Sequence, residues 1–383
     1  MNKTFINKSS RLFAAVAMPV LAFLLVSCSN EDTTADKQEA GYCSVSLRIT
    51  VEGIGATRAT PAGDYDDGRP TAYENYINVI GGDYKVLLFK SDSPYQLAAE
   101  VTETSIVAVE SNPTTSKTYI LSGRIPSNIP DGSYKLMLLA NWNARGASYP
   151  SGNAYTIDGI TNGGGNVFTY STPFELGPGG GIPMFGVVDQ ANIVFKKDQA
   201  TNFGTIHLLR AVAKVEVKPA DSGSAITAAT MTRVNNKGLA APRGIYSQDD
   251  YVKGSYKDDY LSGIHLPGNL SVMENVPFVE QPDGSFVIYV PEYDNTSASA
   301  VKSKIHLTFS SEYSADLEFK FYDSKAALDA GKKVGDAFDI ARNNWYTFTV
   351  TENGVCQVTI MPMRAVDLNM DFGFDDLFPK NFK

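Results

Sequence analysis

Three cysteines and three histidines are the side chains best suited to metal, redox or nucleophilic chemistry in this 383-residue chain. They are widely separated along the sequence: Cys28, Cys43, Cys356, His207, His265 and His306. A zinc or redox site needs thiols, or a set of Cys and His, at short ligand spacing, and the sequence has none. It also lacks catalytic motifs such as GxSxG and HExxH. We therefore expect no metal, no cofactor, no catalytic residue and no enzymatic activity.

Cys28 has a different chemistry available to it. Basic residues precede the apolar run Leu12–Val26, which is too short for a typical membrane span and is characteristic of a signal peptide. The run leads into Leu25-Val-Ser-Cys28, which resembles a bacterial lipobox, where the Cys sulfur receives a diacylglycerol and becomes the new N-terminus. The acidic pair Glu31-Asp32 follows, as in the surface-export signal of some Gram-negative lipoproteins. An ordinary signal peptide followed by a chance cysteine is the alternative.

Arg58 is the second residue whose position predicts a reaction. It lies within 53–63, a run of small residues with a proline and no apolar periodicity, so a trypsin-like protease could cut between Arg58 and Ala59. Before it, Cys43–Val51 alternates between apolar and polar residues without a break, which predicts a half-buried β-strand. Cutting would let this strand leave and open a groove. The apolar positions of this displaced strand are Cys43, Val45, Leu47, Ile49 and Val51.

Composition limits the class of protein. The chain is 43% hydrophobic and 20% charged, so a packed core is expected, and about 300 to 350 mature residues normally form two domains. A net charge of −9 argues against nucleic acid as a partner, because the phosphate backbone requires a basic face. The composition suits a surface protein that resists aggregation.

Short strand patterns separated by Gly, Pro, Asn or Asp dominate the rest of the chain, which is typical of a β-sandwich. We expect strands at Tyr84–Phe89, Gln96–Val109, Lys117–Arg124, Ser133–Trp142, Ala225–Val234, Ser285–Val290, Lys304–Ser310, Ala315–Tyr322 and Asn343–Thr351, and a short helix at Ser324–Lys332. The longest pattern, Gly204–Val217, is placed at a domain junction. Residues 143–181 are glycine-rich, but no Lys with Ser or Thr follows as in a phosphate loop, so a long surface excursion is expected.

The C-terminal tail resembles the first strand. Cys356-Gln-Val-Thr-Ile360 repeats the order Cys, polar, Val, polar, aliphatic of Cys43-Ser-Val-Ser-Leu47, and a second alternating stretch follows. Either segment could refill the groove, because a sheet groove needs only backbone pairing and suitable alternate side chains. The alternative is that the tail completes its own domain. The candidate donor-strand residues are Cys356, Val358, Ile360, Val366, Leu368, Met370 and Phe372.

Together these features resemble the fimbrillins, the subunits of type V pili of anaerobic gut and oral bacteria. The matching features occur in the family's order, and each alone is only weakly specific. They are the lipobox at Cys28, the first strand followed by Arg58-Ala59, a strand of the Tyr84–Phe89 kind, the segment Leu209-Arg-Ala-Val-Ala-Lys-Val215, the segment Ile340-Ala-Arg-Asn-Asn-Trp-Tyr346 and the two tail strands.

The resemblance implies an all-β fold of two tandem, transthyretin- or immunoglobulin-like β-sandwich domains, with a removable first strand and a C-terminal donor tail. The implied segments are 1–27 signal peptide, 28–58 lipidated propeptide, 59–217 and 218–354 sandwich domains, and 355–383 tail. The implied partners are an arginine-specific surface protease, the outer membrane through the lipid before cleavage, and other fimbrial subunits by strand insertion. The protein would be exported through the periplasm as a lipoprotein precursor and reach the outer membrane and the extracellular fimbrium.

Within this class a stalk subunit is favoured over a tip subunit, since the chain carries both a cleavable strand and a donor tail. The alternative is an uncleaved outer-membrane lipoprotein that acts as an anchor or as a glycan- or other ligand-binding module. Such a module would present exposed aromatic rings, whereas Trp142 and Trp345 lie within strand patterns and are expected in the core. Under the donor-tail hypothesis, deletion of residues 355–383 leaves a folded protein that cannot extend a polymer.

Overall fold

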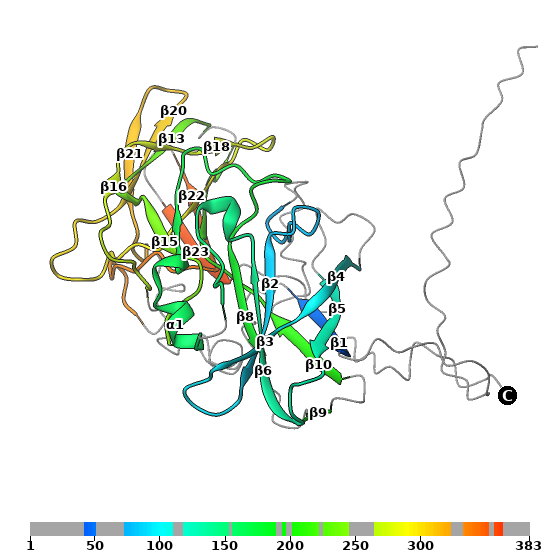
Figure 1. Ribbon diagram of the computed structural model, residues 1–383. Coiled ribbons are helices and arrows are strands. Elements are labelled where there is room, and N and C mark those ends of the chain that lie inside the picture. The colour runs from blue at the N-terminus through cyan, green and yellow to red at the C-terminus, as the bar shows by residue number, and fades with distance from the viewer. Residues whose placement is uncertain are drawn as a thin grey trace, which may run out of the picture. The chain divides into compact units, whose positions relative to one another are not determined.

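The computed structural model describes residues 42–50, 73–109, 118–152, 155–188, 194–196, 201–221, 225–244, 264–322, 332–351 and 356–362. Strands make up nearly all of its regular structure (Figure 1). The predicted all-β class is therefore confirmed. No helix within these residues has the length and hydropathy needed to cross a membrane.

The first two sheets are built from strands that precede residue 211. One sheet has the order β10-β1-β5-β4, and the other has the order β11-β8-β6-β2-β3, with β9 also paired to β6. The bounds are β1 (Tyr42–Thr50), β2 (Tyr84–Lys90), β3 (Leu97–Glu100), β4 (Thr102–Ala108), β5 (Thr118–Pro126), β6 (Gly132–Ala140), β8 (Met184–Val188), β9 (Val194–Phe195), β10 (Thr201–His207) and β11 (Leu209–Arg210).

The next two sheets are built from strands that follow residue 212. Their orders are β18-β19-β12-β22-β23 and β17-β13-β20-β21. The bounds are β12 (Ala213–Pro219), β13 (Ile226–Thr232), β17 (Val276–Pro277), β18 (Val279–Glu280), β19 (Phe286–Val290), β20 (Lys304–Phe309), β21 (Ser314–Glu318), β22 (Asn344–Val350) and β23 (Cys356–Pro362). The predicted boundary between residues 217 and 218 falls inside β12, and the two-domain division stays a prediction.

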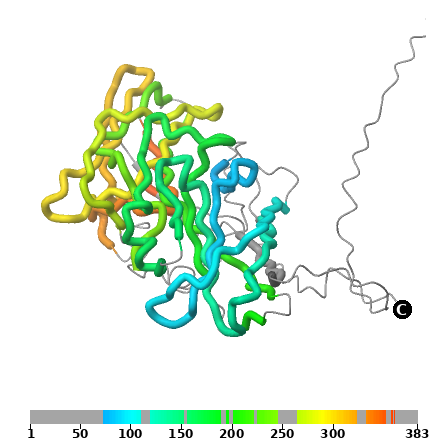
Figure 2. The backbone as a smooth tube through the Cα atoms, in the orientation of Figure 1, coloured from blue at the N-terminus to red at the C-terminus, as the bar shows by residue number. Residues whose placement is uncertain are grey.

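Central strands explain why the core forms. In β2 the run Val86–Phe89 is buried, and β6 is buried from Tyr134 to Ala140. Successive residues point to opposite faces of a strand, so both faces of these two strands are covered. Continuous apolar runs of this kind are expected wherever both faces of a strand are covered. Figure 2 follows the described chain from the blue residues after position 72 to the orange β22.

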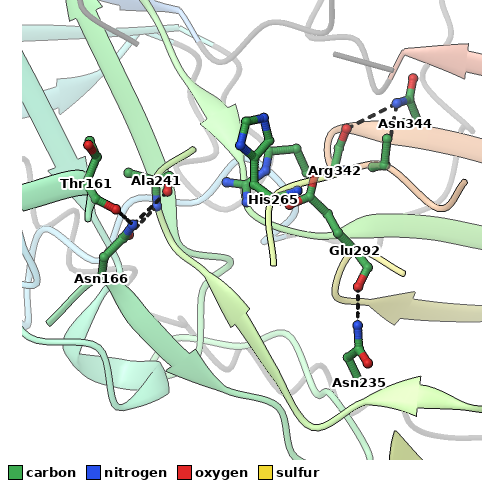
Figure 3. A network of polar contacts seen from close by, with 9 residues as sticks. Thr161, Asn166, Asn235, Ala241, His265, Glu292, Arg342 and Asn344 are labelled. Atoms are coloured by element: carbon green, nitrogen blue, oxygen red, sulfur yellow. Dashed lines mark hydrogen bonds and ion pairs between the residues drawn. The ribbon is translucent and has the colours of Figure 1, made fainter. Parts of the chain in front are cut away.

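One short ladder and one side-chain network join segments from the two halves of the sequence, and a second ladder and a second network lie within the second half. β7 (Val167–Thr169) pairs with β15 (Lys237–Leu239), and β14 (Val234–Asn235) pairs with β16 (Val272–Met273). The Asn166 amide donates to the Ala241 carbonyl at 2.8 Å, while the Ala241 N–H donates to the Asn166 amide oxygen at 2.6 Å (Figure 3).

The second network surrounds a buried ion pair. Glu292 and Arg342 meet at 2.6 Å, and both side chains are nearly fully buried. The backbone N–H of His265 donates to the same carboxylate at 3.0 Å, and the side-chain amide of Asn235 donates to the Glu292 backbone carbonyl at 2.6 Å (Figure 3).

Three predictions about elements need correction. Residues 143–181 are not simply a surface excursion, because Ile157 and Phe168 are fully buried and α1 (Ile157–Thr161) forms there, capped by the Thr156 hydroxyl. The expected strand Gln96–Val109 is divided into β3 and β4. The pattern Gly204–Val217 is likewise divided among β10, β11 and β12. The expected helix at 324–332 lies almost wholly outside the described residues.

Candidate assembly site: the slot of the first strand

The first strand occupies an inner position in its sheet. β1 runs antiparallel to β5 over all nine of its residues, from Tyr42 opposite Pro126 to Thr50 opposite Thr118. Its other edge runs parallel to β10, from Val45 opposite Thr201 to Thr50 opposite His207. Among the described strands, β10 has no other partner in this sheet. β1 therefore joins β10 to β5 and β4 (Figure 1). Its place between β5 and β10 is called the slot below.

The register shows which residues of β5 lie opposite each position of β1. Directly opposite residues of an antiparallel pair lie on the same face of a sheet. Tyr119, Leu121 and Ile125 of β5 are buried, and their partners are Ile49, Leu47 and Cys43. The alternate residues Ile120 and Ser122 are exposed. Cys43, Leu47 and Ile49 are therefore paired with buried residues of β5, and Ser46 and Arg48 with exposed ones.

A β-bulge adjusts the pairing between β1 and β10. The register shifts between Ser46 and Arg48, opposite the part of β10 that contains Gly204. Gly204 has a φ of 79°, a conformation that glycine adopts without the strain other residues suffer, and its N–H donates to the Asn202 side chain at 2.8 Å.

The end of the slot near Thr50 contacts Glu74 and Asn75, which lie C-terminal to the predicted cleavage site. Tyr119, which pairs with Ile49, donates its hydroxyl to the Asn75 carbonyl at 3.0 Å. Arg210, shortly after β10, donates from Nε to the Glu74 carbonyl at 3.1 Å. The chain from Glu74 onward is thus attached to the slot independently of β1.

Arg210 is fully buried among these partners. Its guanidinium donates to the Asn343 side-chain oxygen at 3.0 Å and also contacts the Asn75 amide oxygen. Burial lowers the pKa of Arg210 to about 10, and the nearby Glu74 carboxylate opposes that shift. The group remains a cation at neutral pH, so its hydrogen bonds are charge-assisted.

Lys214 extends this network into β12. Its Nζ lies 2.7 Å from the Glu74 carboxylate and 4.6 Å from the centre of the Trp345 ring. The Tyr289 hydroxyl donates to the same carboxylate. Charged residues within the alternating pattern Gly204–Val217 suggest a solvated face, but Arg210, Lys214 and Glu216 are all nearly fully buried. Nothing in the sequence pattern identifies Glu74 and Asn75 as their partners.

The predicted donor residues are only partly described. Cys356, Val358 and Ile360 lie in β23, which pairs with all seven residues of β22, and Val358 is buried. This pairing completes a sheet of the chain itself, although it does not test which segment inserts during assembly. The other predicted site residues lie outside the described residues: Cys28, Val51, Arg58, Ala59, Val366, Leu368, Met370 and Phe372.

The sequence predicts both tryptophans in the core, and both pack in it or against it. Trp142 is fully buried and donates from its indole N–H to the Met184 carbonyl at 3.1 Å, and Trp345 packs half-buried against the core. No group of three or more His, Cys, Asp or Glu within the described residues is arranged to hold a metal ion.

Solved structures provide the comparison for this arrangement. The tip fimbrial protein Mfa3 from Porphyromonas gingivalis, solved with a C-terminal truncation, is 13% identical, and the match covers 83% of this chain and 99% of that chain with a TM-score of 0.53. The chain has the fold of a fimbrial protein. The resemblance to fimbrillins and the predicted β-sandwich are thereby confirmed at the level of the fold.

Other solved structures match this chain with TM-scores below 0.5. The fimbrial anchor protein Mfa2 from the same species is 10% identical, with coverage of 85% of this chain and 100% of that chain and a TM-score of 0.32. A candidate cell adhesion protein from Bacteroides ovatus is 10% identical, with coverage of 85% and 99% and a TM-score of 0.41. No protein-family model and no curated protein matches the sequence.

Proposed function

We propose that this chain is a structural, non-enzymatic subunit of a surface fimbrium, assembled by strand exchange. In this proposal a protease cuts after Arg58, the lipidated segment leaves with β1, and the tail of another subunit fills the slot. The observation that supports it best is the inner position of β1, paired along both edges. The fimbrial fold is consistent with it.

The energetics of the slot favour replacement of β1. Its departure leaves β5 and β10 with unpaired backbone edges beside Tyr119, Leu121 and Phe203, which are buried when the slot is filled. An open edge over an apolar groove is unfavourable in water. Burying about four apolar side chains, at roughly 1.5–3 kcal/mol each, stabilises the filled slot by about 6–12 kcal/mol. The intact first strand therefore blocks premature assembly.

The segment after β23 is the better donor. β23 is already paired with β22, and extracting it would remove Val358 from the core. Residues 365–372 also alternate between apolar and polar and match the slot in length, eight residues against nine. We therefore assign insertion to Val366, Leu368, Met370 and Phe372 and retain β23 as part of its own sheet. We propose a stalk position, because the sequence carries both a cleavable first strand and an alternating segment after β23 that could act as donor.

The decisive experiment combines the N-terminal residue of the protein at the cell surface with polymer length. We expect Ala59 at the N-terminus of assembled protein, and we expect Arg58→Gln to retain the lipid and to form no polymer. Arg69→Gln is the matched control, since Arg69 lies in the same segment but precedes Pro70, which hinders tryptic cleavage. A wild-type N-terminus at lipidated Cys28 would overturn the proposal and favour an anchor or a ligand-binding lipoprotein.

A further inference from the structure

A chain of contacts connects the Thr50 end of the slot with a pocket. Glu74 and Asn75 are tied to that end by the hydroxyl of Tyr119 and the guanidinium of Arg210. Tyr73, the residue before them, lines a pocket of about 400 Å³. Described contacts therefore lead from the end of β1 to the pocket.

The same network forms one wall of the pocket. The Glu74 carboxylate contacts Lys214 and Tyr289, and both of these residues also line the pocket. The remaining walls are mainly aromatic and aliphatic. They include Tyr170, Phe174, Leu176, Val279, Val287 and Ile288.

The surface of the pocket suits an aromatic side chain. Phe174 stacks on Tyr170, with ring centres 5.5 Å apart, and lies 6.5 Å from the ring of Tyr289. Aromatic rings at such spacing gain from further edge or offset contacts. At the rim, Val279 is 53% exposed and Glu175 is exposed. The other charged lining residue, Lys214, is paired with Glu74, so Glu175 presents an exposed carboxylate beside an apolar interior.

The donor tail is longer than the slot. A donor that reproduces the pairing of β1 runs antiparallel to β5 and leaves the slot at the Thr50 end. If residues 365–372 fill the slot, residues 373–383 remain beyond it, with a reach of about 36–40 Å when extended. This remainder, GFDDLFPKNFK, carries Phe374, Phe378 and Phe382, and Lys380 follows Pro379.

We propose that this pocket binds the aromatic end of the donor tail, residues 373–383, of a second copy of the chain. This inference rests on the proposed strand exchange and deepens it. One phenylalanine fills the aromatic interior, while Lys380 faces the exposed Glu175. The slot then determines the pairing of the donor strand, and the pocket adds affinity at the end where the strand emerges.

The test uses the full chain, cut after Arg58 by an arginine-specific protease in the presence of labelled tail peptides. Peptides 365–383 and 365–372 both begin at Ala365, so they contain no arginine for the protease to cut. We expect the longer peptide to bind at least tenfold more tightly. Val279→Asp should abolish this difference, since it places a charge at the pocket rim.

Val194→Asp is the matched control, because Val194 lies in the strand β9, is 46% exposed and does not line the pocket. It should leave the tenfold difference intact, and both variants should keep the wild-type urea midpoint. Equal affinity of the two peptides for the wild-type protein would overturn the pocket inference while leaving strand exchange in place. Failure of both peptides to bind would refute strand exchange itself. If Val279→Asp changes only the rate of cutting at Arg58, the occupant is the segment 51–72 and the inference is wrong.

Discussion

Glu292 and Arg342 form a buried ion pair, in which each charge is tolerated only while its partner is present. Each side chain is nearly fully buried, and the backbone N–H of Arg342 also donates to the Glu292 carboxylate at 3.3 Å. Removing charges from water is costly, so such a pair contributes little net stability, whereas an unpartnered member destabilises strongly. Arg210 with its amide and carbonyl partners, and Lys214 with Glu74, follow the same rule.

Glu292→Gln should lower the free energy of unfolding by about 3–5 kcal/mol, because it leaves the Arg342 cation buried without a counter-charge. Glu318→Gln is the matched control. Glu318 pairs with Lys304 at 3.6 Å with both side chains about 40% exposed, so its loss should cost about 0–1 kcal/mol. Urea unfolding of both variants measures the difference. Similar losses in the two variants would show that the buried pair has no special role.

For single residues, alternation in the sequence predicts which side chains share a face of a strand. It does not predict which distant residues those side chains contact. The register places Cys43, Leu47 and Ile49 opposite buried residues of β5, while the core face of β1 itself stays a prediction. The same reasoning fails for Arg210 and Lys214, because their partner Glu74 is more than a hundred residues away in sequence. Long-range pairing of this kind depends on topology, which local periodicity does not contain.

The first strand should be held in its slot by its core-facing positions. Leu47→Asp places a carboxylate opposite the buried Leu121, where an unpaired charge is strongly unfavourable. After cleavage at Arg58, the fragment containing β1 should leave the variant at least tenfold faster, as measured by mass spectrometry of the released peptide.

Ser46→Asp is the control for this prediction, because Ser46 pairs with the exposed Ser122. Its fragment should leave at the wild-type rate. Equal acceleration by both substitutions would mean that charge at any position weakens β1, and that the buried face is not what retains it.

Strong strands were predictable as elements, but their order in the sheets was not. Tyr84–Phe89 and Ser133–Trp142 are recognisable from continuous apolar runs, and both became central strands. The parallel pairing of β1 with β10 could not be predicted, because it joins segments about 150 residues apart. The apparent continuity of Gly204–Val217 conceals a turn at Ala211, whose N–H donates to the Pro183 carbonyl at 2.9 Å.

The proposed cleavage and insertion affect two strands in different places, β1 at an inner position of one sheet and β23 at the edge of another. Loss of β1 affects the β10-β1-β5-β4 sheet, while Glu74 and Asn75 keep their own contacts with Arg210 and Tyr119. β23, in contrast, closes one side of a different sheet and contributes Val358 to the core. Removing the first strand and removing β23 therefore have different consequences for stability.

Two C-terminal truncations separate these roles. The sequence suggests deleting residues 355–383, but that deletion also removes β23 and leaves β22 without its seven-residue partner. Deletion of 363–383 keeps β23, so this variant should retain the wild-type urea midpoint, accept a tail peptide after cleavage at Arg58, and fail to extend a polymer. Deletion of 355–383 should unfold at lower urea because Val358 is lost from the core.

Electron microscopy of each cleaved variant, with urea unfolding in parallel, gives the result. Fibres formed by the 363–383 deletion would show that the tail beyond β23 is not the donor, and β23 itself would then have to insert. A loss of stability in the same variant would mean that the tail completes its own subunit. Only a stable subunit that accepts a peptide but cannot donate one fits a polymer in which every chain fills the slot of the next.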